Sequence, residues 1–215
     1  MYNKSSKIIK VLQEKDAFDL EDIDKLCSLS NSSNSEIRGK VAALLGRVSS
    51  EKAEKTLYKL SFDKDELVKL EAIDSLAMAK MSLSIQRLKQ LCFSTDTYFR
   101  FFAYQSYCDA FLNFYQFDST KKIELLEFLR VQEKDEKDEL VLSAVYKCEA
   151  ICGNDKSVLK LMEMHTKAKT DENHHLITPI YNMLEELHIG TAKIKIDEEV
   201  EKFETAVFCA EYNIN

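Results

Sequence analysis

Two cysteines, Cys148 and Cys152, lie four residues apart in an apolar stretch with helical periodicity, and histidines follow them. On a helix this spacing places both thiols on one face, where two thiolates could begin a zinc site. However, the chain has no CxxC pair, and Cys148 also occupies an apolar position of the repeat described below. We therefore expect no metal ion, since the spacing of the histidines fits no known ligand frame: His165, His174, His175 and His188.

Other catalytic arrangements are equally poorly supported. The chain has only four glycines, and none of them forms a phosphate-binding or dinucleotide-binding loop. The order of residues pairs no cysteine with a histidine in an electropositive setting. Glu71 and Asp74 could do acid–base work, but carboxylates on a solvated helix face more often do not. We expect no enzymatic activity and no cofactor.

The charge of the chain favours some partners over others. Its formal net charge is −7 and its pI is near 5.3. A negative body is repelled by phosphate backbones and is attracted to basic proteins. No apolar run is long enough to span a membrane, and the residues from Met1 to Ser6 contain no signal-peptide core. The expectation is a cytoplasmic protein that binds another protein, with no nucleic acid and no membrane partner.

The elements that would position any site come from a repeat with a spacing of 31 residues. Each of its three copies opens with a large apolar residue and a cation, has a small or β-branched residue four places on, and has a large apolar residue eight places on. A short polar residue that suits a helix N-cap precedes each copy. A period of this length indicates an α-solenoid. The aligned segments are 37–46, 68–77 and 99–108, with caps at Asn34, Asp65 and Asp96.

Apolar periodicity predicts that short and longer helices alternate along the chain. After a first helix over 5–15, the pairs are 20–29 with 36–48, 51–61 with 66–80, 83–93 with 97–115, 119–131 with 138–152, and 155–168 with 174–188. The period lengthens to 41 and then 36 in the last two pairs. We therefore predict a single solenoid over 1–189 and a capping segment over 190–215. In that segment 192–197 alternates with period two, which favours a small hairpin over one more helix.

The repeat resembles HEAT repeats, most closely the short bacterial type first described in phycobilin lyases. Leu45 with Gly46 and Leu76 with Ala77 match the Leu-Gly end of that motif, while Asp63, Asp65 and Lys69 match its turn acids and the cation that follows. The resemblance implies an all-α, right-handed α-solenoid of about five helical hairpins. It specifies the fold more than the function, since the family includes scaffolds, inhibitors, lyase subunits and DNA glycosylases.

In such solenoids the second helix of each pair lines the concave face. In 97–115 one stripe of residues faces the core and a second apolar stripe faces the neighbouring helices, which leaves a polar strip free for a ligand. Ten of the 20 residues from Tyr98 to Phe117 are Phe or Tyr, and we assign most of them to packing. Carried to the other repeats, the strip predicts a partner-binding groove of Glu71, Asp74, Met78, Phe102, Gln105, Asp109, Asn113, Tyr146, Asn182 and Glu186, with Lys40, Ala43 and Arg47 in the first repeat and Ser143, Ala150 and Pro179 in the later ones.

The predicted groove is acidic and aromatic through its middle, which suits a partner that presents Lys or Arg side chains. Our interpretation is a non-catalytic protein-binding module, of the inhibitor or immunity type, that neutralises a basic toxin or effector. The composition, rich in Lys, Asn, Ile and Glu, fits a bacterial source. The alternatives are a general scaffold or adaptor subunit, and a HEAT-like nucleic-acid-binding or lyase-type protein. Absence of Trp and the acidic centre weigh against the DNA-binding alternative.

Overall fold

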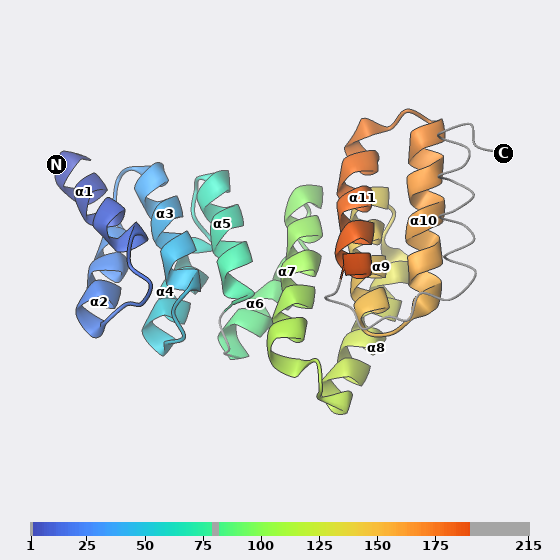
Figure 1. The fold of residues 1–215 in the computed structure, drawn as a ribbon, viewed down its shortest axis with the longest axis horizontal. Coiled ribbons are helices and arrows are strands. Elements are labelled where there is room, and N and C mark those ends of the chain that lie inside the picture. Colours follow the sequence, from blue (N-terminus) through green and yellow to red (C-terminus); the bar gives the residue numbers. More distant parts are fainter. Residues whose placement is uncertain (1, 79–81, 190–215) are drawn as a thin grey trace. The chain divides into compact units, whose positions relative to one another are not determined.

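The computed structural model describes residues 2–78 and 82–189. Within these ranges the chain forms eleven α-helices and no strand (Figure 1). The helices are α1 (Tyr2–Gln13), α2 (Leu20–Leu29), α3 (Ser35–Gly46), α4 (Glu51–Leu60), α5 (Glu66–Leu76), α6 (Ser82–Leu91), α7 (Thr97–Tyr115), α8 (Ser119–Asp135), α9 (Glu139–Ile151), α10 (Asp155–Thr170) and α11 (His174–Ile189). The all-α, HEAT-like solenoid class predicted from the repeat is confirmed, and the hairpin predicted within 190–215 lies outside the described residues.

The chain packs as two compact units, one up to Gln116 and the other from Phe117 onward. The boundary coincides with the point at which the 31-residue period gives way to longer spacings. That the solenoid runs unbroken over 1–189 stays a prediction.

The helices of the first unit form two layers. Helices α1, α3, α5 and α7 make one layer, in which each helix contacts the next, and α2, α4 and α6 make the other (Figure 1). We call these the odd layer and the even layer. Because each repeat contributes one helix to each layer, residues 31 apart occupy equivalent places, and the apolar side chains between the layers are buried. The core residues at the aligned positions are Ile37, Val41, Leu45, Val68, Ala72, Leu76, Phe99, Ala103 and Tyr107.

The start of each odd-layer helix is fixed by the predicted cap. The Asn34 side chain accepts a hydrogen bond from Glu36 N at 2.9 Å, and the Asp96 carboxylate accepts one from Phe99 N at 3.0 Å. Asp65 accepts from the backbone N–H groups of Leu67 and Val68. These bonds satisfy N–H groups that have no partner within the helix, which confirms the three caps read from the sequence.

The first repeated cation ties one repeat to the next. The Arg38 guanidinium binds the Asp63 carboxylate through two hydrogen bonds of 2.7 Å, and the two side chains are only 7% and 10% exposed. Arg38 also donates to the Ser32 and Ser33 carbonyl oxygens at 2.9 and 3.3 Å. This arginine therefore closes the turn before α3 and fixes the turn before α5.

Buried polar groups in the even layer are also paired across repeats. Glu54 of α4 accepts hydrogen bonds from both the backbone N–H and the hydroxyl of Ser84 in α6, at 2.7 and 2.6 Å. Arg87 of α6 donates to the Ser61 hydroxyl and carbonyl oxygens, and its guanidinium carbon lies 3.6 Å from the centre of the Phe62 ring. A shift between neighbouring repeats would leave the buried charge of Glu54 or Arg87 without its partner, which would lower the free energy of unfolding. These bonds therefore fix the register of neighbouring repeats.

In the second unit α9 contacts α8, α10 and α11, and α10 also contacts α11. Most of α9 is buried, including the charged residues Lys147 and Glu149. The Lys147 ammonium pairs with Glu186 of α11, while Glu149 accepts hydrogen bonds from Ser157 and Asn154.

The end predicted for the helix over 119–131 is wrong, because α8 continues to Asp135. Gln132, Glu133 and Lys134 are all good helix formers, and Glu133 binds Lys160 of α10 from the last turns of α8.

Candidate protein-binding surface

Three of the predicted partner-binding residues lie on α5 or just beyond its end. Met78, just beyond its end, is 56% exposed, Asp74 is exposed and Glu71 is half-buried. The helix buries Val68, Ala72, Ile73 and Leu76 on its opposite side. The 3.6-residue period therefore separates these three residues from the core as the sequence predicts.

The corresponding residues of α7 lie on the next helix of the odd layer. Phe102 is 37% exposed, Asn113 is exposed, and Gln105 and Asp109 are half-buried. The Asn113 amide nitrogen lies 3.4 Å from Met78 Sδ and 3.5 Å from the Ala77 carbonyl oxygen, so the α5 and α7 residues meet at this point. We call the combined set the α5–α7 strip: Glu71, Asp74, Met78, Phe102, Gln105, Asp109 and Asn113.

The two carboxylates of α5 are partly deprived of water. Partial burial raises the pKa of Glu71 above its usual range, and the nearby charge of Asp74 adds to this. Partial loss of hydration also raises the pKa of Asp74, although its side chain is exposed. Among the residues that the structure describes, neither carboxylate forms an ion pair or a hydrogen bond. A cation placed here would remove the mutual repulsion and replace the lost hydration.

The two cations that the sequence places in the first repeat of the groove already make other contacts. Lys40 pairs with Glu36 on the same helix at 2.6 Å. The Arg47 guanidinium donates to the Lys15 carbonyl oxygen at 2.6 Å and lies 5.0 Å from the centre of the Phe18 ring. Arg47 therefore helps to hold the segment that follows α1 against the end of α3.

The predicted partner-binding residues of the second unit lie in different surroundings from one another. Tyr146 lines a hollow of about 300 Å³ beside α10, and the Lys160 ammonium lies 4.5 Å from the centre of its ring. Asn182 and Glu186 are exposed on α11, where Glu186 already pairs with Lys147. The prediction that Ser143 and Ala150 share an open strip with Tyr146 is wrong, since both residues are fully buried. Helices α8, α10 and α11 enclose α9 and leave Glu139, Leu142 and Tyr146 as its more open line.

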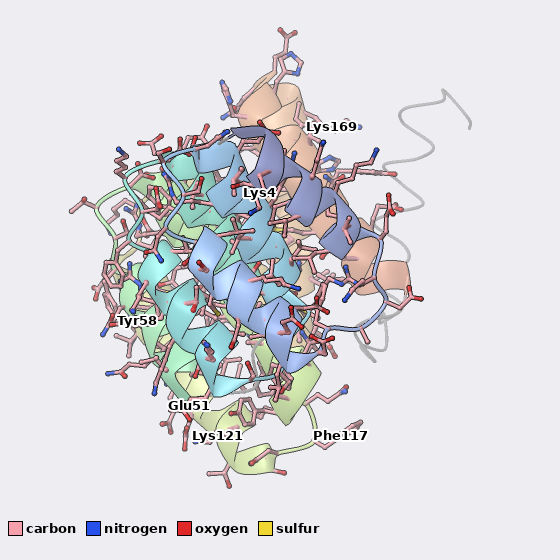
Figure 2. The ribbon with its side chains drawn as sticks, turned by 90° about the vertical axis from the view of Figure 1, so that its left-hand side faces the viewer. Lys4, Glu51, Tyr58, Phe117, Lys121 and Lys169 are labelled. Atoms are coloured by element: carbon pink, nitrogen blue, oxygen red, sulfur yellow. The ribbon has the colours of Figure 1, made fainter. Side chains whose placement is uncertain are left out.

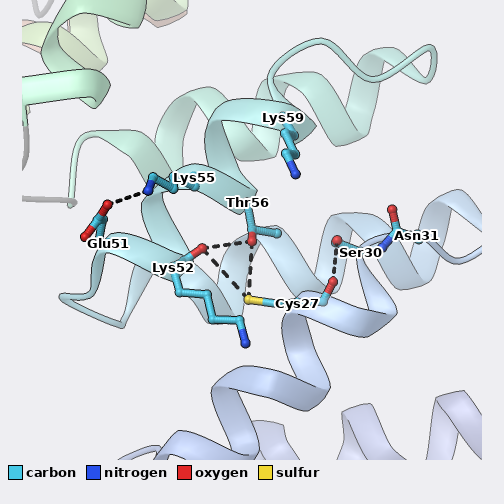
Figure 3. A pocket seen from close by; sticks show the side chains of 8 residues that line it. All are labelled: Cys27, Ser30, Asn31, Glu51, Lys52, Lys55, Thr56 and Lys59. Atoms are coloured by element: carbon cyan, nitrogen blue, oxygen red, sulfur yellow. Dashed lines mark hydrogen bonds and ion pairs between the residues drawn. The ribbon is translucent and has the colours of Figure 1, made fainter.

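One surface feature was missed by the sequence analysis, which considered only the second helix of each pair. A hollow lies between α2 and α4 in the even layer, and three lysines line it (Figure 3). Their positions, Lys52, Lys55 and Lys59, follow helical spacing along one face of α4. That pattern could have indicated a basic face from the sequence alone.

The first unit consists of paired helices in two layers that repeat at a constant period, and one layer carries a polar strip. This architecture is that of an α-helical repeat protein of the kind that binds other proteins. Residues 23–107 match the family model of HEAT repeats. Over this region the chain is similar to HEAT repeats, which agrees with the resemblance seen in its sequence. HEAT repeats generally form non-catalytic modules for protein interaction or scaffolding. No curated protein matches the chain.

None of the helices in 2–78 and 82–189 is long and apolar enough to cross a membrane. No group of three or more His, Cys, Asp or Glu side chains in the same ranges is arranged to hold a metal ion.

Proposed function

We propose that this chain is a non-catalytic protein-binding module whose α5–α7 strip binds a basic protein, and that it acts as an inhibitor of the immunity type that neutralises a basic toxin or effector. The observation that carries the proposal is the pair Glu71 and Asp74, two partly desolvated carboxylates without a cationic partner among the described residues.

The energetics of this pair favour a cationic ligand. Part of the cost of removing water from the carboxylates is already met in the folded protein, so an incoming Lys or Arg gains more than it would at fully solvated acids. Phe102 and Met78 supply exposed apolar surface on the same strip, which suits the aliphatic stem of a long cationic side chain. The net charge of −7 adds long-range attraction for a basic partner. The same field and the same carboxylates disfavour a phosphate backbone.

The test is a pull-down from a lysate of the source organism with the parent protein and with the Asp74→Lys, Asp109→Lys variant. The expected result is one basic protein that the parent retains and the variant loses, with retention that weakens as salt rises. A control variant, Glu124→Lys with Glu127→Lys, makes the same charge change at exposed positions of α8 and should retain the partner. If the control loses the partner equally, only overall charge matters and the strip is not the binding site.

A milder substitution separates binding from folding. Because burial raises the pKa of Asp74, its charged form slightly destabilises the fold, and this penalty develops as pH rises through the pKa of the folded state. Asp74→Asn should therefore leave the free energy of unfolding at neutral pH unchanged or higher by a few tenths of a kcal/mol, since solvent screens an exposed carboxylate. Weaker partner binding with intact stability would show that the carboxylate serves binding.

A general scaffold or adaptor is the second candidate. The observation that favours it is the basic hollow between α2 and α4, which lies on the opposite layer from the acidic strip. Several proteins retained by the parent and by the Asp74→Lys, Asp109→Lys variant alike would favour this candidate over the inhibitor.

A further inference from the structure

The hollow between α2 and α4 differs in charge from the rest of the molecule. It has a volume of about 550 Å³, and its lining contains three lysines and a single acid, Glu51 (Figure 3). This local excess of positive charge occurs in a chain whose formal net charge is −7. Figure 2 shows the side chains of α4 from the side, with Glu51 labelled at its start and Tyr58 near its end.

The three lysines differ in whether their ammonium groups already have an ion-pair partner. The Lys52 ammonium pairs with Asp24 of α2 at 2.5 Å, and the Lys55 ammonium pairs with Glu51. Both pairs are well exposed, so solvent screens them and they constrain the lysines weakly. Lys59 forms no ion pair or hydrogen bond within the described part of the chain.

Polar groups of α2 and α4 complete the lining. The Ser30 hydroxyl donates to the Cys27 carbonyl oxygen at 2.7 Å, and Thr56 Oγ1 lies 2.9 Å from the Lys52 carbonyl oxygen. Both hydroxyls already donate their protons to carbonyl oxygens, so toward a ligand they can act only as acceptors. The exposed Asn31 amide, at the far side of the hollow, adds a donor. The hydrogen-bond donors that remain available are therefore the Lys59 ammonium and the Asn31 amide, and both suit a ligand that accepts hydrogen bonds.

The spacing of the lysines suits an extended chain better than a small anion. Lys55 and Lys59 are four residues apart on a helix, which separates them by about 6 Å along its axis. Alternate side chains of an extended peptide are about 7 Å apart, so two carboxylates of such a peptide can reach two of these lysines together. A single small anion would fill only part of a hollow of about 550 Å³.

From this geometry we propose that the α2–α4 hollow binds an extended acidic segment of a protein partner, through Lys55, Lys59 and Asn31. The site is separate from the α5–α7 strip and has the opposite charge. It does not depend on the function proposed for that strip.

The proposal is tested by titrating the full-length, isotope-labelled protein with hexaglutamate and following backbone amide shifts by NMR. The expected result is a saturable change confined to the hollow, centred on Asn31, Lys55 and Lys59. The Lys55→Gln, Lys59→Gln variant should bind about five- to tenfold more weakly, since each exposed ion pair is worth a few-fold in affinity. A matched control, Lys7→Gln with Lys10→Gln on exposed positions of α1, should bind as the parent does.

Three results would overturn the proposal. Shifts spread over lysines throughout the molecule would show binding governed by charge alone. Tighter binding of a single-stranded oligonucleotide at the same amides would assign the hollow to nucleic acid. The segment 196–204 of this chain contains five acidic residues, and if a peptide of that sequence bound the hollow more tightly than hexaglutamate, the chain itself would supply the occupant.

Discussion

A pair of glycine substitutions in α3 tests how closely neighbouring repeats approach. A Cβ atom added to Gly46 would lie 2.9 Å from Ser75 Cβ, 3.0 Å from Ser75 Oγ and 3.2 Å from Ser75 Cα. Carbon atoms in ordinary contact are about 3.5–4.0 Å apart, so α3 and α5 must separate to admit Gly46→Ala. Rotating the Ser75 side chain does not help, because its Cα and Cβ atoms are themselves in the way. Overpacking of this kind costs about 1–3 kcal/mol.

Gly39 provides the matched control on the same helix. An added Cβ at this position meets no atom within 4 Å. Gly39→Ala should therefore raise the free energy of unfolding by up to about 1 kcal/mol, which is the usual gain from replacing glycine inside a helix. The two substitutions, identical in chemistry and seven residues apart, are expected to change stability in opposite directions.

Urea denaturation followed by circular dichroism at the helical band measures both effects. Because both variants share the same second unit, the difference between them, about 1–4 kcal/mol, reports on the first unit alone. Adding Ser75→Gly to Gly46→Ala should recover part of the loss, since it removes two of the three clashing atoms. Equal stability of the Gly46→Ala and Gly39→Ala variants would refute the close approach of α3 and α5.

Two further predictions concern groups that are buried in the fold. Asp63→Ala should lower the free energy of unfolding by about 3–5 kcal/mol, because it leaves the Arg38 guanidinium buried without its partner, whereas Lys25→Ala, which breaks an exposed pair, should cost under about 0.5 kcal/mol. The hydrogen bond from Arg38 lowers the pKa of Asp63. The ionised carboxylate therefore stabilises the fold fully above the unfolded-state pKa of about 3.9, and this stabilisation is lost as pH falls through the pKa of the folded state. The free energy of unfolding should consequently fall less steeply with acid in Asp63→Ala than in the parent. Burial strongly raises the pKa of the Cys92 thiol, so in peptide mapping after treatment with a thiol reagent, the half-buried Cys27 should be labelled in the native protein and Cys92 only after unfolding. Early labelling of Cys92 would contradict the burial of α6.

Much of the first unit could be predicted from the sequence because its repeat is regular. A constant spacing of 31 carries the cap, the core stripe and the polar strip from one helix to the next, so reading Phe99 and Ala103 as core also placed Val68 and Ala72 there. Helix α7 is the strictest case. Most of its aromatic residues are buried, as predicted, and Phe102 is exposed, but Phe114 and Tyr115 in its last turn are only half-buried.

What the sequence could not supply is the partner of each polar side chain. Arg38 meets Asp63 and Glu54 meets Ser84, which are contacts 25 and 30 residues apart, and both depend on how the loops bend. The same limit explains the error at Ser143 and Ala150. The strip was carried from α7 to α9 by aligning the two helices, although the spacing between these repeats is longer than 31 residues. A small error in that alignment moves the predicted strip around the helix axis. Because three other helices enclose α9, such a shift places predicted surface residues in the core.

The repeat also explains how one small unit could carry two surfaces of opposite charge. The core uses only the faces that meet between layers, so the outward positions of the odd and even layers can vary independently. An inhibitor needs one such surface, whereas an adaptor needs two that can be occupied at once. If the basic partner and hexaglutamate bind with affinities that do not depend on each other, both surfaces are open together and the adaptor is favoured. If each weakens the other, they compete for a shared region, and the two surfaces defined by these residues are not separate sites.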